Sequence, residues 1–276
     1  MLDNSRMEAS QSSPARKSER AEDRPVYEQP LSERMRTFMR LEFLFQQIGH
    51  HAGQSTEWDT RAALNTLLDI IEIITRIDVR SDLLKELDRN AGTLSRLRSR
   101  DDIDTRRLGN VLESLEEVSA RLSAGGSPVS GSLKHSEFLL MLRNRATIPG
   151  GSCGFDLPGY QQWLQRPFAD RARDIKGWLS HLDPMQRAIR LILMLVRESA
   201  MPGRHVAEDG LFQQSLGTGA GAQLLRVWVA PSLGVFPEIS GGRHRLTIRF
   251  MERPETDERP RQTMRDIPFE LACCQL

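Results

Sequence analysis

Apolar residues recur at three- and four-residue intervals from Pro30 onward for about 170 residues, a pattern typical of amphipathic helices. Potential capping residues mark where these helices begin, and Gly125-Gly126 ends the fourth. The expected starts are Ser32, Ser55 or Thr56, Ser81, Asp104, a fifth helix over 133–146, a sixth around Trp178, and Asp183-Pro184. The third and fourth helices carry narrow heptad-like apolar seams, which favour pairing with each other or with a second subunit. The pattern therefore predicts about seven helices.

The apolar period changes to two after the glycine-rich stretch at 217–222, which predicts β-strands. Alternating runs cover 224–229, 244–250 and 267–272, with turn sequences between them. A sheet of about 55 residues is expected to be too small for its own core and to pack on the helices. We therefore predict an α+β fold, with a helical domain at 25–202 followed by a small antiparallel β-sheet domain at 203–276.

Residues 1–24 differ from the rest of the chain because they contain almost no large apolar side chains. Such a segment cannot offset the entropy lost on ordering, so we expect a disordered extension.

Composition narrows the possible functions. The 276 residues carry 38 Lys+Arg against 37 Asp+Glu, and this near-zero balance argues against a protein that coats polyanions generally. The most apolar stretch, 67–77, contains three charged residues, and the N-terminus lacks the apolar core of a secretory signal. The three cysteines cannot form a disulfide framework and fit a reducing cytosol. We thus expect a cytoplasmic protein without metal, cofactor or membrane partner.

Arginines stand out on two of the predicted strands. Arg245 and Arg249 share one face of their strand, and Arg226 lies beside Trp228 on an earlier strand. If these strands are neighbours, their exposed face combines several guanidinium groups with one aromatic ring, which suits an acidic peptide or a phosphate. The alternative is an ordinary solvated sheet face.

The helical region has similar arginine pairs. Arg36 and Arg40 stand one turn apart on the first helix, where like charges are mildly destabilising unless something binds them. Glu33 offers an alternative explanation, because it can form an ion pair with Arg36. Arg76 and Arg80 repeat the spacing near Asp78, with the same two interpretations.

Motifs of catalysis are not recognisable in the sequence. The run GTGAG at 217–221 lacks the preceding strand and following helix that a dinucleotide site requires. We find neither a nucleophile elbow nor a paired cysteine and histidine, so the sequence gives no reason to expect an enzyme.

Long segments closely resemble the ZapD family of FtsZ-associated cell division proteins. These are YEQPLSERMRTFMRLEFLFQQ (27–47), DVRSDLLKELDR (78–89), TIPGGSCGFDLP (147–158), PEISGGRHRLTIRFM (237–251) and FELACC (269–274). The resemblance implies a cytoplasmic, non-catalytic symmetric homodimer with a helical and a β-strand domain. It also implies binding to the C-terminal tail of FtsZ and bundling of FtsZ filaments in the Z-ring during septation at mid-cell.

The family's basic binding surface, carried over by resemblance, corresponds to Arg36, Arg40, Arg76, Arg245 and Arg249, and strand geometry adds Arg226. The helical and sheet arginines must converge for this to hold. The chain departs from the usual family pattern in its N-terminal extension, at 123–137, at 203–222 and in Gln275-Leu276. A rival hypothesis is a nucleic-acid or nucleotide-binding protein that uses the same arginine face.

Overall fold

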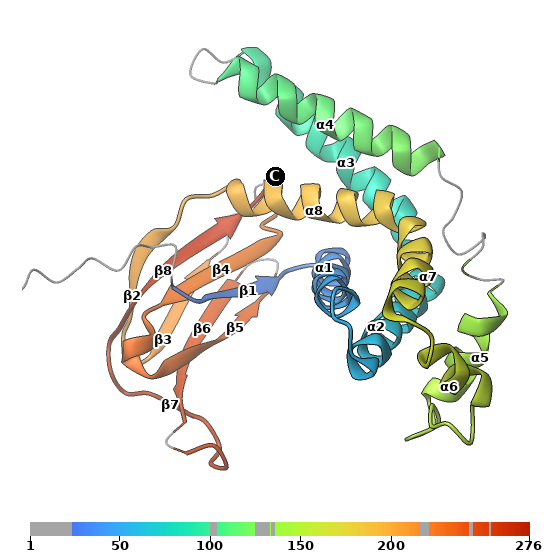
Figure 1. Ribbon diagram of the computed structural model, residues 1–276. Helices are drawn as coiled ribbons and strands as arrows, with labels where there is room; N and C mark the ends of the chain where they lie inside the picture. The colour runs from blue at the N-terminus through green and yellow to red at the C-terminus, as the bar shows by residue number, and fades with distance from the viewer. Residues whose placement is uncertain are drawn as a thin grey trace, which may run out of the picture.

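The structure is a computed structural model that describes residues 24–99, 104–124, 133, 136–215, 221–242, 245–253 and 255–276. The extension predicted at 1–24 lies outside the described residues except for Arg24. Helices occupy most of the first two thirds of the chain and strands the last third, so the α+β class is confirmed (Figure 1).

The described part of the chain contains eight α-helices. They are α1 (Glu33–Ala52), α2 (Glu57–Arg76), α3 (Val79–Ser95), α4 (Thr105–Ala124), α5 (Glu137–Ala146), α6 (Pro158–Leu164), α7 (Phe168–Ser180) and α8 (Asp183–Glu198). Ser32 and Thr56 cap α1 and α2 through their hydroxyl groups, as their sequence positions predict. Helix α3 begins slightly earlier than expected, because the carboxylate of Asp78 accepts from Ser81 N. The short α6 was not predicted.

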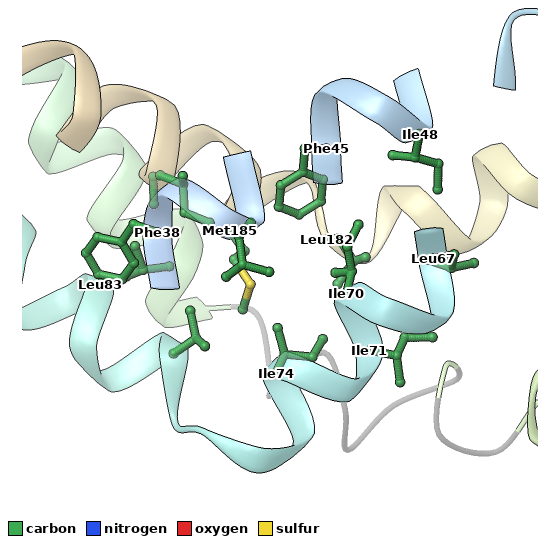
Figure 2. Packing of buried hydrophobic residues seen from close by; sticks show 14 of the residues in the cluster. Phe38, Phe45, Ile48, Leu67, Ile70, Ile71, Ile74, Leu83, Leu182 and Met185 are labelled. Carbon is green, nitrogen blue, oxygen red and sulfur yellow. The ribbon is translucent and has the colours of Figure 1, made fainter. Parts of the chain in front are cut away.

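One hydrophobic core joins these helices. Buried residues of α1, α2, α3 and α8 belong to one cluster, which includes Phe38, Ile70 and Met185 (Figure 2). Helices α3 and α4 lie side by side as a long hairpin (Figure 1), which agrees with their narrow apolar seams. Trp163 is buried, whereas Trp58 of α2 is 78% exposed.

The strands form two antiparallel sheets. Their bounds are β1 (Val26–Pro30), β2 (Gly203–Ala207), β3 (Leu211–Ser215), β4 (Leu224–Val229), β5 (Val235–Gly241), β6 (Arg245–Glu252), β7 (Arg261–Gln262) and β8 (Ile267–Cys274). The first sheet has the order β1-β4-β8-β2, and the second has the order β3-β6-β5 with β7 beside β6. Strand β1 lies within the range predicted as helical, yet it pairs with β4.

The sheets pack face to face and then onto the helices. Val227 and Phe269 of the first sheet share a hydrophobic cluster with Ile248 of the second. On the opposite face of the first sheet, Leu224 and Cys274 join the helical core. The expectation that the strands lack their own core was wrong, because eight strands rather than three or four enclose one. The layers are therefore second sheet, first sheet and helices.

Candidate functional site

Two of the predicted arginines lie together in a hollow between α1 and α2. Arg36 and Arg40 stand one turn apart on α1 and border a cavity of about 490 Å³, called here the α1–α2 groove. Its remaining walls are mainly apolar. They include Met39, Phe43 and Leu44 of α1 and Ile73 of α2. The groove can therefore accept a ligand that presents both an anion and an apolar side chain.

The charge of these arginines is largely available. Arg36 Nε forms the ion pair with Glu33 that the sequence offered as an alternative, at 3.3 Å, but Glu33 is 85% exposed and such a pair is weak. The exposed Arg40 has no ion pair with any described residue. A single carboxylate, Asp69, lies within the groove, and burial together with the neighbouring charge of Glu72 raises its pKa. The groove thus carries more positive than negative charge.

Arg76 lies near the same end of this helix pair. Because α1 and α2 form an antiparallel hairpin, the last turn of α2 is close to the first turn of α1. Arg76 makes an ion pair of 2.7 Å with Glu72, but both side chains are exposed. Exposed pairs of this kind contribute about 0–1 kcal/mol, so the pair leaves Arg76 able to exchange partners.

Arg245 belongs to the end of the second sheet that adjoins the start of α1. Gly242 N donates to Arg245 O, and the adjacent Gly241 packs against the side chain of Leu31, just before α1. The Arg245 side chain is exposed and has no ion pair with the described part of the chain. Its position beside the β1–α1 junction places it at the same end of the molecule as Arg36 and Arg76.

Arg249 lies one step further along the same exposed face of β6. It pairs at 3.2 Å with Glu238 of the neighbouring strand, and both side chains are about half exposed. Arg249 therefore extends the face of Arg245, although part of its charge is compensated.

Arg226 does not share that face. Its strand, β4, lies in the first sheet, so a complete sheet layer separates the side of Arg226 from the outer face of β6. The expectation of one exposed arginine face that includes Trp228 was therefore wrong. Arg226 instead points toward the helices, where its Nε donates to Glu28 at 2.9 Å and its guanidinium lies 4.8 Å from the Trp228 ring.

Arg226 is part of a larger charge network between strands and helices. Arg197 of α8 donates to both carboxylate oxygens of Glu28 on β1 and to both of Glu42 on α1, at 2.7–2.9 Å. Arg226 Nη1 donates to Arg197 O at 3.3 Å. We call Glu28, Glu42, Arg197 and Arg226 the interdomain charge network. The four side chains are mostly buried, and the two positive charges balance the two negative ones. The groups therefore bind one another rather than an external ligand.

The apolar part of the groove was not predicted from the sequence. Phe43 is 63% exposed, although it lies within an otherwise well-patterned helix. Met39 lies on the same helix, is only partly buried and faces the groove. Apolar side chains beside Arg36 and Arg40 were the available signal, since a purely solvated helix face is polar.

Catalytic or metal chemistry finds no support elsewhere in the described residues. They include no group of three or more His, Cys, Asp or Glu side chains that could hold a metal ion. Burial raises the pKa of the Cys273 thiol, and it raises the pKa of Cys274 to about 11, so neither is an activated nucleophile. No described helix is sufficiently long and apolar to cross a membrane.

Comparison with known proteins gives one consistent result. The profile of the ZapD family, described as "Cell division protein", matches residues 39–249. "Cell division protein ZapD" of Aromatoleum aromaticum is 41% identical over 250 residues, which cover 91% of this chain and 97% of the relative. The protein of the same name from Methylococcus capsulatus is 42% identical over 251 residues, covering 91% and 98%. The family match begins within α1 and ends within β6, so it includes Arg40 and most of the groove as well as Arg245 and Arg249, whereas Arg36 precedes it.

Proposed function

The chain belongs to the ZapD family of cell division proteins, and from this premise we propose that it is a non-enzymatic factor that binds the C-terminal tail of FtsZ. In this proposal Arg36, Arg40, Arg76, Arg245 and Arg249 contact the tail. Arg226 supports the site from the interior instead, because its guanidinium is already bound to Glu28.

One observation carries the proposal: exposed arginines and apolar side chains line a single groove at the junction of helices and strands. A tail that carries acidic and apolar residues fits both features. Carboxylates can pair with Arg36 and Arg40, while an apolar side chain can enter between Phe43 and Ile73. Arg245 lies at the same end of the molecule and can receive a further carboxylate.

Filament bundling requires more than one such site in the assembly. In the proposed homodimer, twofold symmetry duplicates the groove, so that one dimer holds tails from two FtsZ filaments. Many tails project from each filament, and this multivalency strengthens weak individual contacts. The protein would then act in the cytoplasm at the mid-cell ring, promoting Z-ring assembly.

The structure favours this function over the rival nucleic-acid or nucleotide reading. That reading depended on a wide arginine face with Trp228 on it, and Arg226 and Trp228 face the helices instead. The remaining site has an apolar floor and one carboxylate, Asp69, which suit a peptide better than a phosphate backbone.

Co-sedimentation with FtsZ filaments tests the proposal. Full-length FtsZ should form bundles with this protein, whereas FtsZ that lacks its tail should not. Charge reversal in the double variant Arg245→Glu/Arg249→Glu should abolish bundling and leave the circular dichroism spectrum unchanged, because both side chains are exposed. Equal bundling of intact and tail-less FtsZ would refute tail capture.

A further inference from the structure

The connection between strands and helices is short at the proposed site. Strand β1 ends at Pro30 and α1 begins at Glu33, so only Leu31 and Ser32 join them. Leu31 N donates to Gln223 O and Ser32 caps α1, so the backbone torsions of these two residues set the angle between β1 and α1. Arg40 is on α1, whereas Arg245 belongs to the sheets. The angle at this link therefore decides how these two arginines lie relative to each other.

Arg197 bridges this link from a third element. Its guanidinium donates to Glu28, three residues before the link, and to Glu42, ten residues after it. Each carboxylate receives two hydrogen bonds, and this forked geometry restricts orientation as well as distance. Arg226 adds a bond to Glu28 and another to Arg197 O, which ties β4 into the same group.

From these contacts we propose that Arg197 is a positioning residue that fixes the angle between β1 and α1 and so aligns Arg245 with the α1–α2 groove. The alignment role rests on the proposed tail binding, whereas the fixed angle does not. Arg197 itself touches no ligand, because both carboxylates it binds are internal. The interdomain charge network thus acts on binding only through the arrangement of the exposed arginines.

Hydrogen exchange of the full-length protein tests the fixed angle. In Arg197→Gln, amides of β1 and of the last turn of α8 should exchange several-fold faster than in the wild type. Amides inside β6 and α2 should keep their rates, since neither sheet nor helical core is altered. Arg197→Lys retains the positive charge but cannot bind both carboxylates in forked geometry, so it should show a smaller acceleration at the same places. The control Glu117→Gln breaks an exposed pair with Arg121 and should change neither segment.

Unchanged exchange in β1 and α8 would overturn the proposal. Faster exchange throughout β6 and α2 would also overturn it, because Arg197 would then stabilise the whole fold rather than one angle. If Arg197→Gln does not fold, the exchange rates of Arg197→Lys decide whether the angle is fixed by this residue.

A double-variant cycle with an FtsZ tail peptide tests alignment separately. If Arg197 acts by positioning Arg245, then Arg245→Ala should weaken binding much less in the Arg197→Lys background than in the wild type, by a factor of about three or more. Arg40→Ala should weaken binding equally in both backgrounds, because the groove is formed mainly by α1 and α2, on the helical side of the link. If Arg245→Ala weakened binding by the same factor in both backgrounds, the proposed alignment of Arg245 by Arg197 would be refuted. No effect of either alanine variant in the wild type would refute the proposed tail site, while the exchange result would still decide the fixed angle.

Discussion

At the scale of single residues, the arginines of this chain have different roles in the structure. Arg226 and Arg197 are bound to Glu28 and serve the connection between strands and helices. Arg40 and Arg245 are exposed and have no carboxylate partner among the described residues. Exposed charges of the second kind can be exchanged with little effect on the fold, so their contribution to binding can be measured cleanly.

Replacement of Arg40 by alanine should weaken tail-peptide binding about tenfold, since a charge-assisted hydrogen bond contributes about 1.5–3 kcal/mol. The free energy of unfolding should change by no more than about 0.5 kcal/mol. Isothermal titration calorimetry and urea denaturation measure the two quantities. Arg143→Ala, at an exposed position on α5, is the matched control and should alter neither. Unchanged affinity in Arg40→Ala would remove this arginine from the site.

Glu86 provides a pH-dependent test of a second contact between helices and strands. Its side chain is 1% exposed and accepts from Arg34, Arg89 and Gln223. Burial alone would raise the pKa of this carboxyl, but the hydrogen bonds from Arg89 and Gln223 and the positive charge of Arg89 outweigh burial and lower it. The resulting stabilisation is complete above the ordinary glutamate pKa and is lost as pH falls through the lowered one.

We expect Glu86→Gln to reduce the free energy of unfolding by about 3 kcal/mol at neutral pH, because it leaves two arginines without their buried partner. The difference from the wild type should stay constant down to about pH 5 and shrink below it. Urea denaturation across this range measures the effect, with Glu116→Gln on the exposed face of α4 as control. A difference that grows as the solution is acidified would contradict the lowered pKa.

The surroundings of Arg226 were only partly predictable from the sequence. Alternation correctly separated Arg226 from the buried Leu225 and Val227 of its strand. It could not show whether the other face meets solvent or helices, because the partner of Arg226, Glu28, is 198 residues away in the chain. The two-residue apolar period distinguishes the two faces of a strand. Which layer covers each face depends on long-range packing.

At the scale of elements, local chemistry explains which predictions succeeded. Ser32 and Thr56 cap their helices because a hydroxyl can accept from a free backbone amide two or three residues later. Strand β1 contains only five residues and no clear alternation, and it is stabilised by pairing with the distant β4. The tight turn between β2 and β3, which belong to different sheets, had a sequence signal that we did not use. It is Asp209-Gly210, a pair typical of two-residue turns.

Gly210 makes this turn between the two sheets sensitive to substitution. Its φ of 71° lies in the left-handed region, and a Cβ there would collide with the backbone carbonyl of Thr263. Gly210→Ala should therefore lower the free energy of unfolding by about 2 kcal/mol or more, of which about 1–2 kcal/mol reflects the backbone conformation alone. Thermal or urea unfolding monitors the change.

The control is a glycine without such constraints. Gly177 lies in α7, and nothing lies within 4 Å of the position its Cβ would occupy. Gly177→Ala should raise stability by up to about 1 kcal/mol through helix propensity. Equal effects of the two substitutions would show that the turn between the sheets is not strained by a side chain.

At the scale of the whole molecule, the proposed binding surface depends on how three layers meet. The second sheet supplies Arg245, the helices supply the α1–α2 groove, and the first sheet is joined to the helices by the ion pair of Glu28 on β1 with Arg197 on α8. The family resemblance supplied the candidate arginines, whose role in binding stays a prediction, and helix patterning predicted the scaffold of Arg36 and Arg40. Neither could predict the apolar floor or the sandwich that separates Arg226 from Arg245, since both arise only when distant elements pack.

The central claim is that the α1–α2 groove receives the FtsZ tail, and methyl NMR during titration with a tail peptide tests it most directly. Met39 and Ile73 line the groove, whereas Met194 and Met264 are exposed on α8 and after β7. We predict that the methyl signals of Met39 and Ile73 shift until saturation while those of Met194 and Met264 stay unchanged. Binding of the peptide with no shift at Met39 and Ile73 would contradict the account.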